Sequence, residues 1–265
     1  MCSSDLNPNA DFAMVSAIFA DAERFSDATS EYLEGEVPAS RIAMCDVNRD
    51  GRDDILACSG KARLLIATDT GFKDWSVNWG IPEGSFQGGV FGDYTGDGHA
   101  DLYLYGDSRM VLLENVDGKK FVDATEGSGI VPFELSTHSA AWGDFNGDGR
   151  MDLYICNRNT EFHKGHGLVP IWGHDQVFYN NGDGTFRDGT DGLDKSQSRY
   201  AGRGVAPVDY NRDGLLDLFV ANYSLHPNML YRNGGADGLR NHGFDTGVCG
   251  VATEFPVETY FGHTV

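Results

Sequence analysis

Apolar and polar residues follow one another along the chain in short blocks, and few stretches show the spacing of an amphipathic helix. Runs of four apolar residues, rich in β-branched and aromatic types, are separated by polar turns that contain glycine. Such runs predict short buried strands. The clearest examples are residues 55–58, 102–105, 153–156 and 218–221. The chain is therefore expected to be all-β.

The same nine-residue string, D-x-[N/T]-x-D-G-x-x-D, stands directly before each of these runs, at residues 46–54, 93–101, 144–152 and 209–217. Oxygen-bearing side chains at positions 1, 3, 5 and 9 can converge on one hard cation, and the carbonyl of position 7 adds another oxygen. Glycine at position 6 permits the sharp reversal of the chain. The alternative is a set of Asx-type turns that bind no metal.

The string predicts four Ca²⁺ sites. The expected ligands, with position 7 contributing only its carbonyl, are Asp46, Asn48, Asp50, Arg52 and Asp54; Asp93, Thr95, Asp97, His99 and Asp101; Asp144, Asn146, Asp148, Arg150 and Asp152; and Asp209, Asn211, Asp213, Leu215 and Asp217.

The EF-hand opens with a similar string, but it needs a carboxylate at position 12 and a helix on each side. Position 12 is occupied by Ala57, Leu104, Ile155 and Val220 in the four copies. Predicted strands follow every copy, so the string is expected to join two strands. A dockerin-type helical repeat is excluded for the same reason.

A larger repeat surrounds each string. Third strands are predicted at residues 64–66, 111–113, 177–179 and 229–231. A fourth strand with the pattern F-x-D-x-S/T begins at Phe72, Phe121 and Phe186, and an earlier copy begins at Phe25. The aspartate of this pattern precedes the next nine-residue string by 19, 19, 21 and 21 residues. Four strands in a unit of about 50 residues predict a β-propeller in which each unit is one four-stranded blade.

Composition narrows the choice of partner. The chain has 265 residues and a formal net charge of −20, which argues against nucleic acid and against anionic membrane surfaces. Four bound Ca²⁺ ions would reduce that charge to −12, so part of the acidity is explained as ligand. No run of 18 apolar residues is present, so no membrane span is predicted.

The whole pattern resembles the FG-GAP/VCBS repeat family, whose blades carry calcium loops like those of integrin α-subunit propellers. The approaches Phe91-Gly-Asp and Trp142-Gly-Asp carry the resemblance, as does the stretch from Val177 through Asn-Asn-Gly-Asp-Gly-Thr to Phe186. It covers residues 24–265 and leaves 1–23 as an N-terminal segment partly outside the repeat. Thr95, in place of Asn or Asp, departs from the pattern and predicts weaker binding at the second site.

The resemblance implies an extracellular, periplasmic or cell-surface module. It also implies that the four to five blades expected here are an open part of a larger ring, commonly of seven blades, so the missing blades or further domains of a longer chain are expected partners.

Two groups of residues are candidates for contacting a protein or carbohydrate ligand. Gln87, His138, Arg203 and His263 occupy equivalent places at the start of successive first strands, where a propeller would gather them around its axis. A long insertion in the third unit is the other candidate, because recognition is often placed on long loops of a rigid scaffold. The candidate residues on that insertion are His163, His166, Trp172 and His174. The alternatives are polar residues that bind water in the central channel and a solvated or blade-packing loop.

The sequence contains no nucleophile motif, P-loop or dinucleotide fingerprint. The leading hypothesis is therefore a non-catalytic, calcium-stabilised propeller module for adhesion or recognition. The alternative is a polysaccharide lyase or hydrolase that acts on an acidic glycan through His138, His174 or Arg203 near Trp172.

Overall fold

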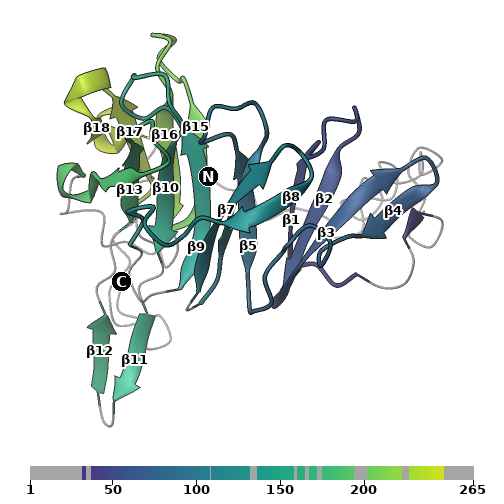
Figure 1. Cartoon of the computed structure of the whole chain (residues 1–265). Helices are drawn as coiled ribbons and strands as arrows, with labels where there is room; N and C mark the ends of the chain where they lie inside the picture. Colours follow the sequence, from purple (N-terminus) through teal and green to yellow (C-terminus); the bar gives the residue numbers. More distant parts are fainter. Residues whose placement is uncertain are drawn as a thin grey trace, which may run out of the picture.

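The structure is a computed structural model that describes residues 32–33, 37–107, 109–131, 136–157, 160–164, 167–171, 175–193, 202–222 and 227–247. The described residues form four four-stranded antiparallel sheets and one two-stranded sheet. The four larger sheets follow one another as blades, and the first and the last lie at opposite ends of an open arc (Figure 1). The predicted fold, an open set of propeller blades, is confirmed. Residues 1–23 and the copy of the repeat at Phe25 lie outside the described residues.

Each blade is a meander whose neighbouring strands pair antiparallel. Blade 1 consists of β1 (Arg41–Cys45), β2 (Asp54–Ser59), β3 (Lys61–Thr68) and β4 (Gly71–Asp74). Blade 2 consists of β5 (Gly88–Gly92), β6 (Asp101–Tyr105), β7 (Met110–Val116) and β8 (Lys120–Asp123). Blade 3 consists of β9 (Thr137–Gly143), β10 (Asp152–Asn157), β13 (Gln176–Asn180) and β14 (Phe186–Asp188). Blade 4 consists of β15 (Gly202–Val208), β16 (Asp217–Asn222), β17 (Met229–Asn233) and β18 (Leu239–Asn241).

Short helical turns accompany the outer strands of blades 3 and 4, namely η2 (Thr190–Gly192), η3 (Gly235–Asp237) and α3 (Gly243–Thr246). Every nine-residue string joins the first strand of a blade to its second, as expected, and no described string is flanked by helices.

Adjacent blades are held together by hydrophobic side chains buried between their faces. Leu56 of blade 1 packs in one cluster with Leu102 of blade 2, and Leu112 of blade 2 packs with Phe178 of blade 3. A third cluster lies around Tyr154, between blades 3 and 4. A fully buried side chain of this kind contributes about 1.5–3 kcal/mol. The apolar runs of the sequence are therefore the surfaces on which the blades stack.

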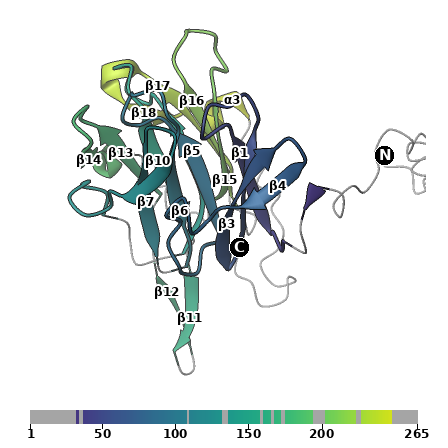
Figure 2. The ribbon, with the colours of Figure 1, turned by 45° about the vertical axis from the view of Figure 1, so that its right-hand side comes forward.

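The insertion in blade 3 contains a hairpin of β11 (Thr160–Lys164) and β12 (Gly167–Ile171), which projects away from the blades (Figures 1 and 2). The sequence pattern predicted a loop over this segment. Its apolar residues alternate with polar ones only briefly and without turn signals as clear as those of the blades, so the added pair of strands was not predicted.

Candidate functional site: the acidic loops and the polar belt

The acidic loops are loop 1 (46–54), loop 2 (93–101), loop 3 (144–152) and loop 4 (209–217). Backbone N–H groups of each loop point at its position-1 aspartate. In loop 1, Asp50 N donates to Asp46 Oδ1 at 3.0 Å and Gly51 N donates to Asp46 Oδ2 at 2.8 Å. The same two bonds occur in the other three loops. The position-6 glycines have φ of 88, 90, 85 and 89°, a left-handed conformation that explains glycine there.

In three of the loops, side-chain oxygens of positions 1 and 3 converge on one point, the backbone N–H of position 5. Asp50 N donates to Asn48 Oδ1 at 3.0 Å as well as to Asp46. In loops 3 and 4 the corresponding bonds to Asn146 Oδ1 and Asn211 Oδ1 are both 2.9 Å. Because each of these oxygens has a second lone pair, the pair can still face a cation. This arrangement suits a hard ion that takes oxygen ligands.

Loop 2 lacks this convergence. Thr95 Oγ1 lies 3.4 Å from Asp93 Oδ1 and 3.3 Å from Asp101 Oδ2, and its single proton can be donated to either carboxylate. The threonine hydroxyl is thus directed at carboxylates of its own loop, and a cation there would have to displace it. The prediction of a weaker second site rests on this difference and stays a prediction.

The position-9 aspartates fasten each loop to the interior of its blade. Asp152 is fully buried, and its two oxygens accept from Phe145 N and Asn180 N, both at 2.9 Å. Asp54, Asp101 and Asp217 accept equivalent pairs of backbone N–H groups. Burial raises the pKa of Asp152 to about 7 and that of Asp101 to about 6, although these N–H donors oppose the shift. Position 9 is therefore a structural acceptor whether or not it also meets a cation.

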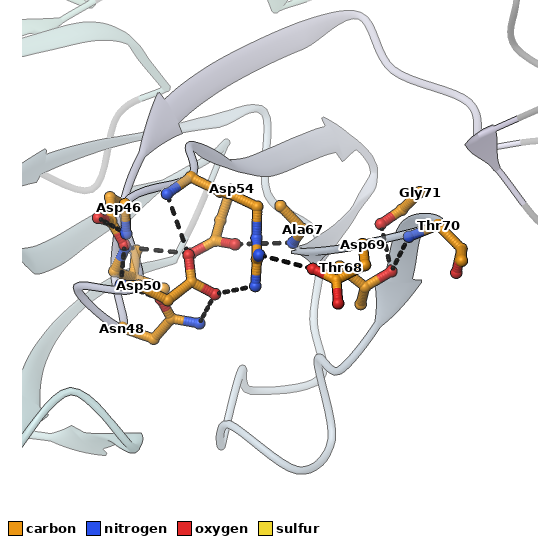
Figure 3. A network of polar contacts seen from close by, with 12 residues as sticks. Asp46, Asn48, Asp50, Asp54, Ala67, Thr68, Asp69, Thr70 and Gly71 are labelled. Carbon is orange, nitrogen blue, oxygen red and sulfur yellow. Dashed lines mark hydrogen bonds and ion pairs between the residues drawn. The ribbon is translucent and has the colours of Figure 1, made fainter.

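Guanidinium groups lie on the outer side of three loops. Arg52 Nη2 is 2.8 Å from Asp50 Oδ2, Arg150 Nη2 is 2.5 Å from Asp148 Oδ2, and Arg232 approaches loop 4. The same arginine, Arg52, also reaches Asp69 in the turn between β3 and β4 (Figure 3). The Oδ1 atom of each position-5 aspartate instead accepts the N–H of position 7. The arginines thus use oxygens that differ from those held by the loop backbone.

In the part of the chain that the structure describes, no three His, Cys, Asp or Glu side chains form a group that could hold a metal on their own. A calcium ion would need the mixed set of loops 1, 3 and 4, namely carboxylates at positions 1 and 5, the amide oxygen at position 3 and the carbonyl at position 7. Those donors are all oxygens, as calcium prefers, so the residues present fit the ion.

Three asparagines that were not predicted as site residues connect neighbouring loops. Asn180 Nδ2 donates to Tyr94 O of loop 2 at 2.8 Å and to Met151 O of loop 3 at 3.1 Å. Asn115 joins loops 1 and 2, and Asn233 joins loops 3 and 4, in the same manner. We refer to Asn115, Asn180 and Asn233 as the latch asparagines. They place all four loops side by side along one edge of the arc.

The sequence did contain a signal for these residues. Each latch asparagine is the last or next-to-last residue of a third strand, and its backbone N–H donates to the position-9 aspartate of its own blade. Ala67 stands in the equivalent place in blade 1 and donates in the same way to Asp54. Aligning the third strands on this position would have shown Asn in three blades and Ala in one.

The acidic loops follow the end of the first strand of each blade. Near the start of these first strands, some of the predicted ring of polar residues lie in contact. Arg203 Nη1 lies 3.0 Å from His138 Nδ1. Because a guanidinium can only donate, Nδ1 is the acceptor and the proton of the neutral ring is on Nε2. Arg41 Nη1 donates to Gln87 Oε1 at 3.4 Å. His138 is buried, whereas Arg41, Gln87 and Arg203 are half-buried; we refer to these four residues as the polar belt.

Asp107, which was not predicted as a site residue, links this belt across two blades. It accepts from Gln87 Nε2 and from Ser136 Oγ, which precedes β9. The remaining candidates lie outside the described residues, namely the side chain of His163 in β11 and all of His166, Trp172, His174 and His263.

A buried carboxylate lies beneath this belt. Asp175 is fully buried and accepts from Tyr154 Oη at 3.0 Å and from Asn157 N at 2.9 Å, and the Cys156 thiol is also a donor to it. Burial raises the pKa of Asp175 to about 7, and these three donors only partly offset that rise. The protonated form is thus favoured by folding.

The substitution Asp175→Asn is expected to change how stability depends on pH. Since the folded pKa lies above the unfolded value near 4, this group stabilises the wild-type fold below pH 4 and loses that contribution as pH rises through about 7. The variant should be more stable than the wild type at pH 8, by at least about 1.4 kcal/mol, and should approach it at pH 5. Urea unfolding at both pH values measures this. Parallel pH profiles for the two proteins would contradict it.

A family model described as FG-GAP-like repeat matches this chain at residues 46–104, 93–155 and 168–220, which together are more than half of it. The chain belongs to the FG-GAP-like repeat family. The resemblance inferred from the nine-residue strings is thereby confirmed, and each matched range contains at least one acidic loop or the strands that follow it.

Two curated relatives match about three quarters of this chain. Cartilage acidic protein 1 from Homo sapiens is 41% identical over 214 residues, which is 72% of this chain and 31% of that protein. Its Mus musculus counterpart is 26% identical over 229 residues, 74% of this chain and 33% of that protein. The chain thus spans about a third of the length of the curated relatives it matches.

Among solved structures, an Agrocybe aegerita lectin matches with a TM-score of 0.46 and 16% identity, over 75% of this chain and 50% of that chain. That lectin specifically recognises non-reducing terminal N-acetylglucosamine.

Proposed function

We propose that this FG-GAP chain is a calcium-binding β-propeller module that recognises a protein or carbohydrate partner outside the cell and has no catalytic role. The observation that carries the calcium part is the convergence of position-1 and position-3 oxygens on one point in loops 1, 3 and 4. The formal charge of −20 adds a reason, because crowded carboxylates are relieved by a divalent cation.

The extracellular setting is supported by the kind of site. Calcium modules that work at millimolar calcium need only modest affinity, with Kd of about 10⁻⁴–10⁻³ M. The carboxylates of these exposed loops are partly neutralised by arginine, which fits this modest affinity better than the high affinity of a cytosolic calcium buffer. No helix among the described residues has the length and apolar character needed to cross a bilayer.

The alternative of a lyase or hydrolase gains no support from the described residues. His138 is buried and already accepts from Arg203, so it does not face a substrate there. Recognition by the rigid blade surface is the role that the geometry supports best.

Calorimetric titration of chelator-stripped chain with CaCl₂ tests the calcium part directly. We expect saturable binding of about three to four ions, with one site weaker than the rest because of Thr95. The variant Thr95→Asn should strengthen that weak site. No measurable heat and no retained calcium at millimolar concentration would contradict the proposal.

A further inference from the structure

A groove of about 520 Å³ opens between blades 1 and 2, beside loop 1. Its aromatic lining is Trp75 and Trp79, and its polar lining includes Arg52, Asp69 and Lys119. A groove of this size falls within the range of small-ligand sites, which combine an apolar surface with a few fixed polar groups. None of the residues predicted from the sequence to form the ligand face lines it.

The two tryptophans have different roles. Trp79 is buried between the blades, with its ring 5.5 Å from that of Phe121, and forms a fixed floor. Trp75 directly follows β4 and is 44% exposed, which is unusual for so large an apolar side chain. Blades 2 and 3 carry Ala124 and Gly189 at the place of Trp75 in the F-x-D-x-S/T pattern. Packing of a blade therefore does not require an aromatic residue at this position.

The polar groups of the groove are balanced in charge. Arg52 lies 2.8 Å from Asp50 and 2.9 Å from Asp69, so its guanidinium stands between two carboxylates at the rim of the groove. With Lys119, the lining has two positive and two negative groups. A strongly charged ligand would gain little from such a lining, whereas a neutral molecule with many hydroxyls could donate to the carboxylates and accept from the guanidinium.

We propose that this groove binds a neutral saccharide, with one sugar ring stacked on Trp75 and its hydroxyls bonded to Arg52 and Asp69. The C–H face of a sugar ring carries partial positive charge and is attracted to the negative face of an indole, so an exposed tryptophan beside polar groups suits it. This inference rests on the proposed recognition function and names its site and its ligand class.

The test is titration of the whole chain, in constant calcium, with neutral methyl glycosides and neutral oligosaccharides of glucose, galactose, mannose and N-acetylglucosamine, and with glucuronate as the charged counterpart. Tryptophan fluorescence and calorimetry report binding. We expect at least one neutral saccharide to bind, and glucuronate to bind at least ten-fold more weakly. Trp75→Ala should weaken that binding at least ten-fold and abolish the fluorescence change.

Two controls distinguish a loss of binding in the groove from misfolding of the chain and from a change in its net charge. Trp75→Ala should fold, because blade 2 carries alanine at the equivalent position; its melting temperature verifies this. Lys119→Ala removes a charge from the groove, whereas Lys120→Ala removes the same charge from the neighbouring exposed residue outside it. Only the first should change saccharide affinity.

The inference is overturned if no neutral saccharide binds at 10 mM, if Trp75→Ala binds as the wild type does, or if the chain captures a peptide through Trp75 and binds no saccharide. These outcomes leave the calcium titration untouched, so failure of the groove and failure of the calcium proposal are distinguishable.

Discussion

Removal of calcium with EDTA is expected to lower the melting temperature of the chain, and millimolar calcium should restore it. With free calcium about ten-fold above Kd, each occupied site adds about 1.4 kcal/mol to the free energy of unfolding. For a chain of this size that corresponds to about 3–6 °C per site. Differential scanning calorimetry at constant ionic strength measures the effect. Identical melting curves with and without calcium would contradict the calcium proposal.

The variant Asp148→Asn assigns this effect to a loop. Its amide oxygen can still accept the Arg150 N–H that Asp148 Oδ1 accepts at 3.0 Å, so the calcium-free stability should change little. The lost negative charge should remove about one site's share of the calcium-dependent increment. Asp117→Asn, in an exposed turn of blade 2, is the matched control and should leave the full increment. Equal increments in both variants would show that loop 3 holds no calcium.

Replacement of the latch residue Asn180 by alanine is expected to destabilise the chain by about 2–4 kcal/mol. Asn180 is 2% exposed, and loss of its side chain leaves the buried Tyr94 O and the partly buried bond site at Met151 O without this donor. A buried polar group without a partner costs about 1–3 kcal/mol. Urea unfolding followed by circular dichroism measures the change in the free energy of unfolding.

Asn181 provides the matched control for the latch. It is the next residue, it is exposed, and its Nδ2 donates only to Thr185 Oγ1 within the same turn. Asn181→Ala should therefore cost less than about 1 kcal/mol. Equal losses for the two variants would mean that the asparagine latch does not connect the blades energetically.

The repeat made most of the fold predictable. The four strings predicted the turn between the first two strands of every blade because glycine at position 6 and aspartate at positions 1 and 9 are required by local backbone geometry. The third and fourth strands followed from apolar runs such as 177–179 and from the F-x-D-x-S/T pattern. These turns and strands depend on residues close together in the chain, so they could be predicted from a single sequence.

Features that depend on neighbouring blades were not predictable in the same way. The contact of Asn180 with Tyr94 O joins residues 86 positions apart in the chain. The groove beside Trp75 likewise exists only because loop 1 and the start of β8 meet there. The burial of His138, one of the residues predicted for the axial ring, likewise depends on how closely β9 and β15 approach one another.

Each latch asparagine reaches back to the loop of the blade before it, which gives the array a direction. A duplicated blade appended after blade 4 would bring its own asparagine and would find an acceptor carbonyl already in place. A blade placed before blade 1 would find Ala67 where that asparagine is needed. During synthesis, likewise, every blade emerges when its predecessor can already have folded. The direction of the asparagine contacts therefore matches the order in which the blades are synthesised.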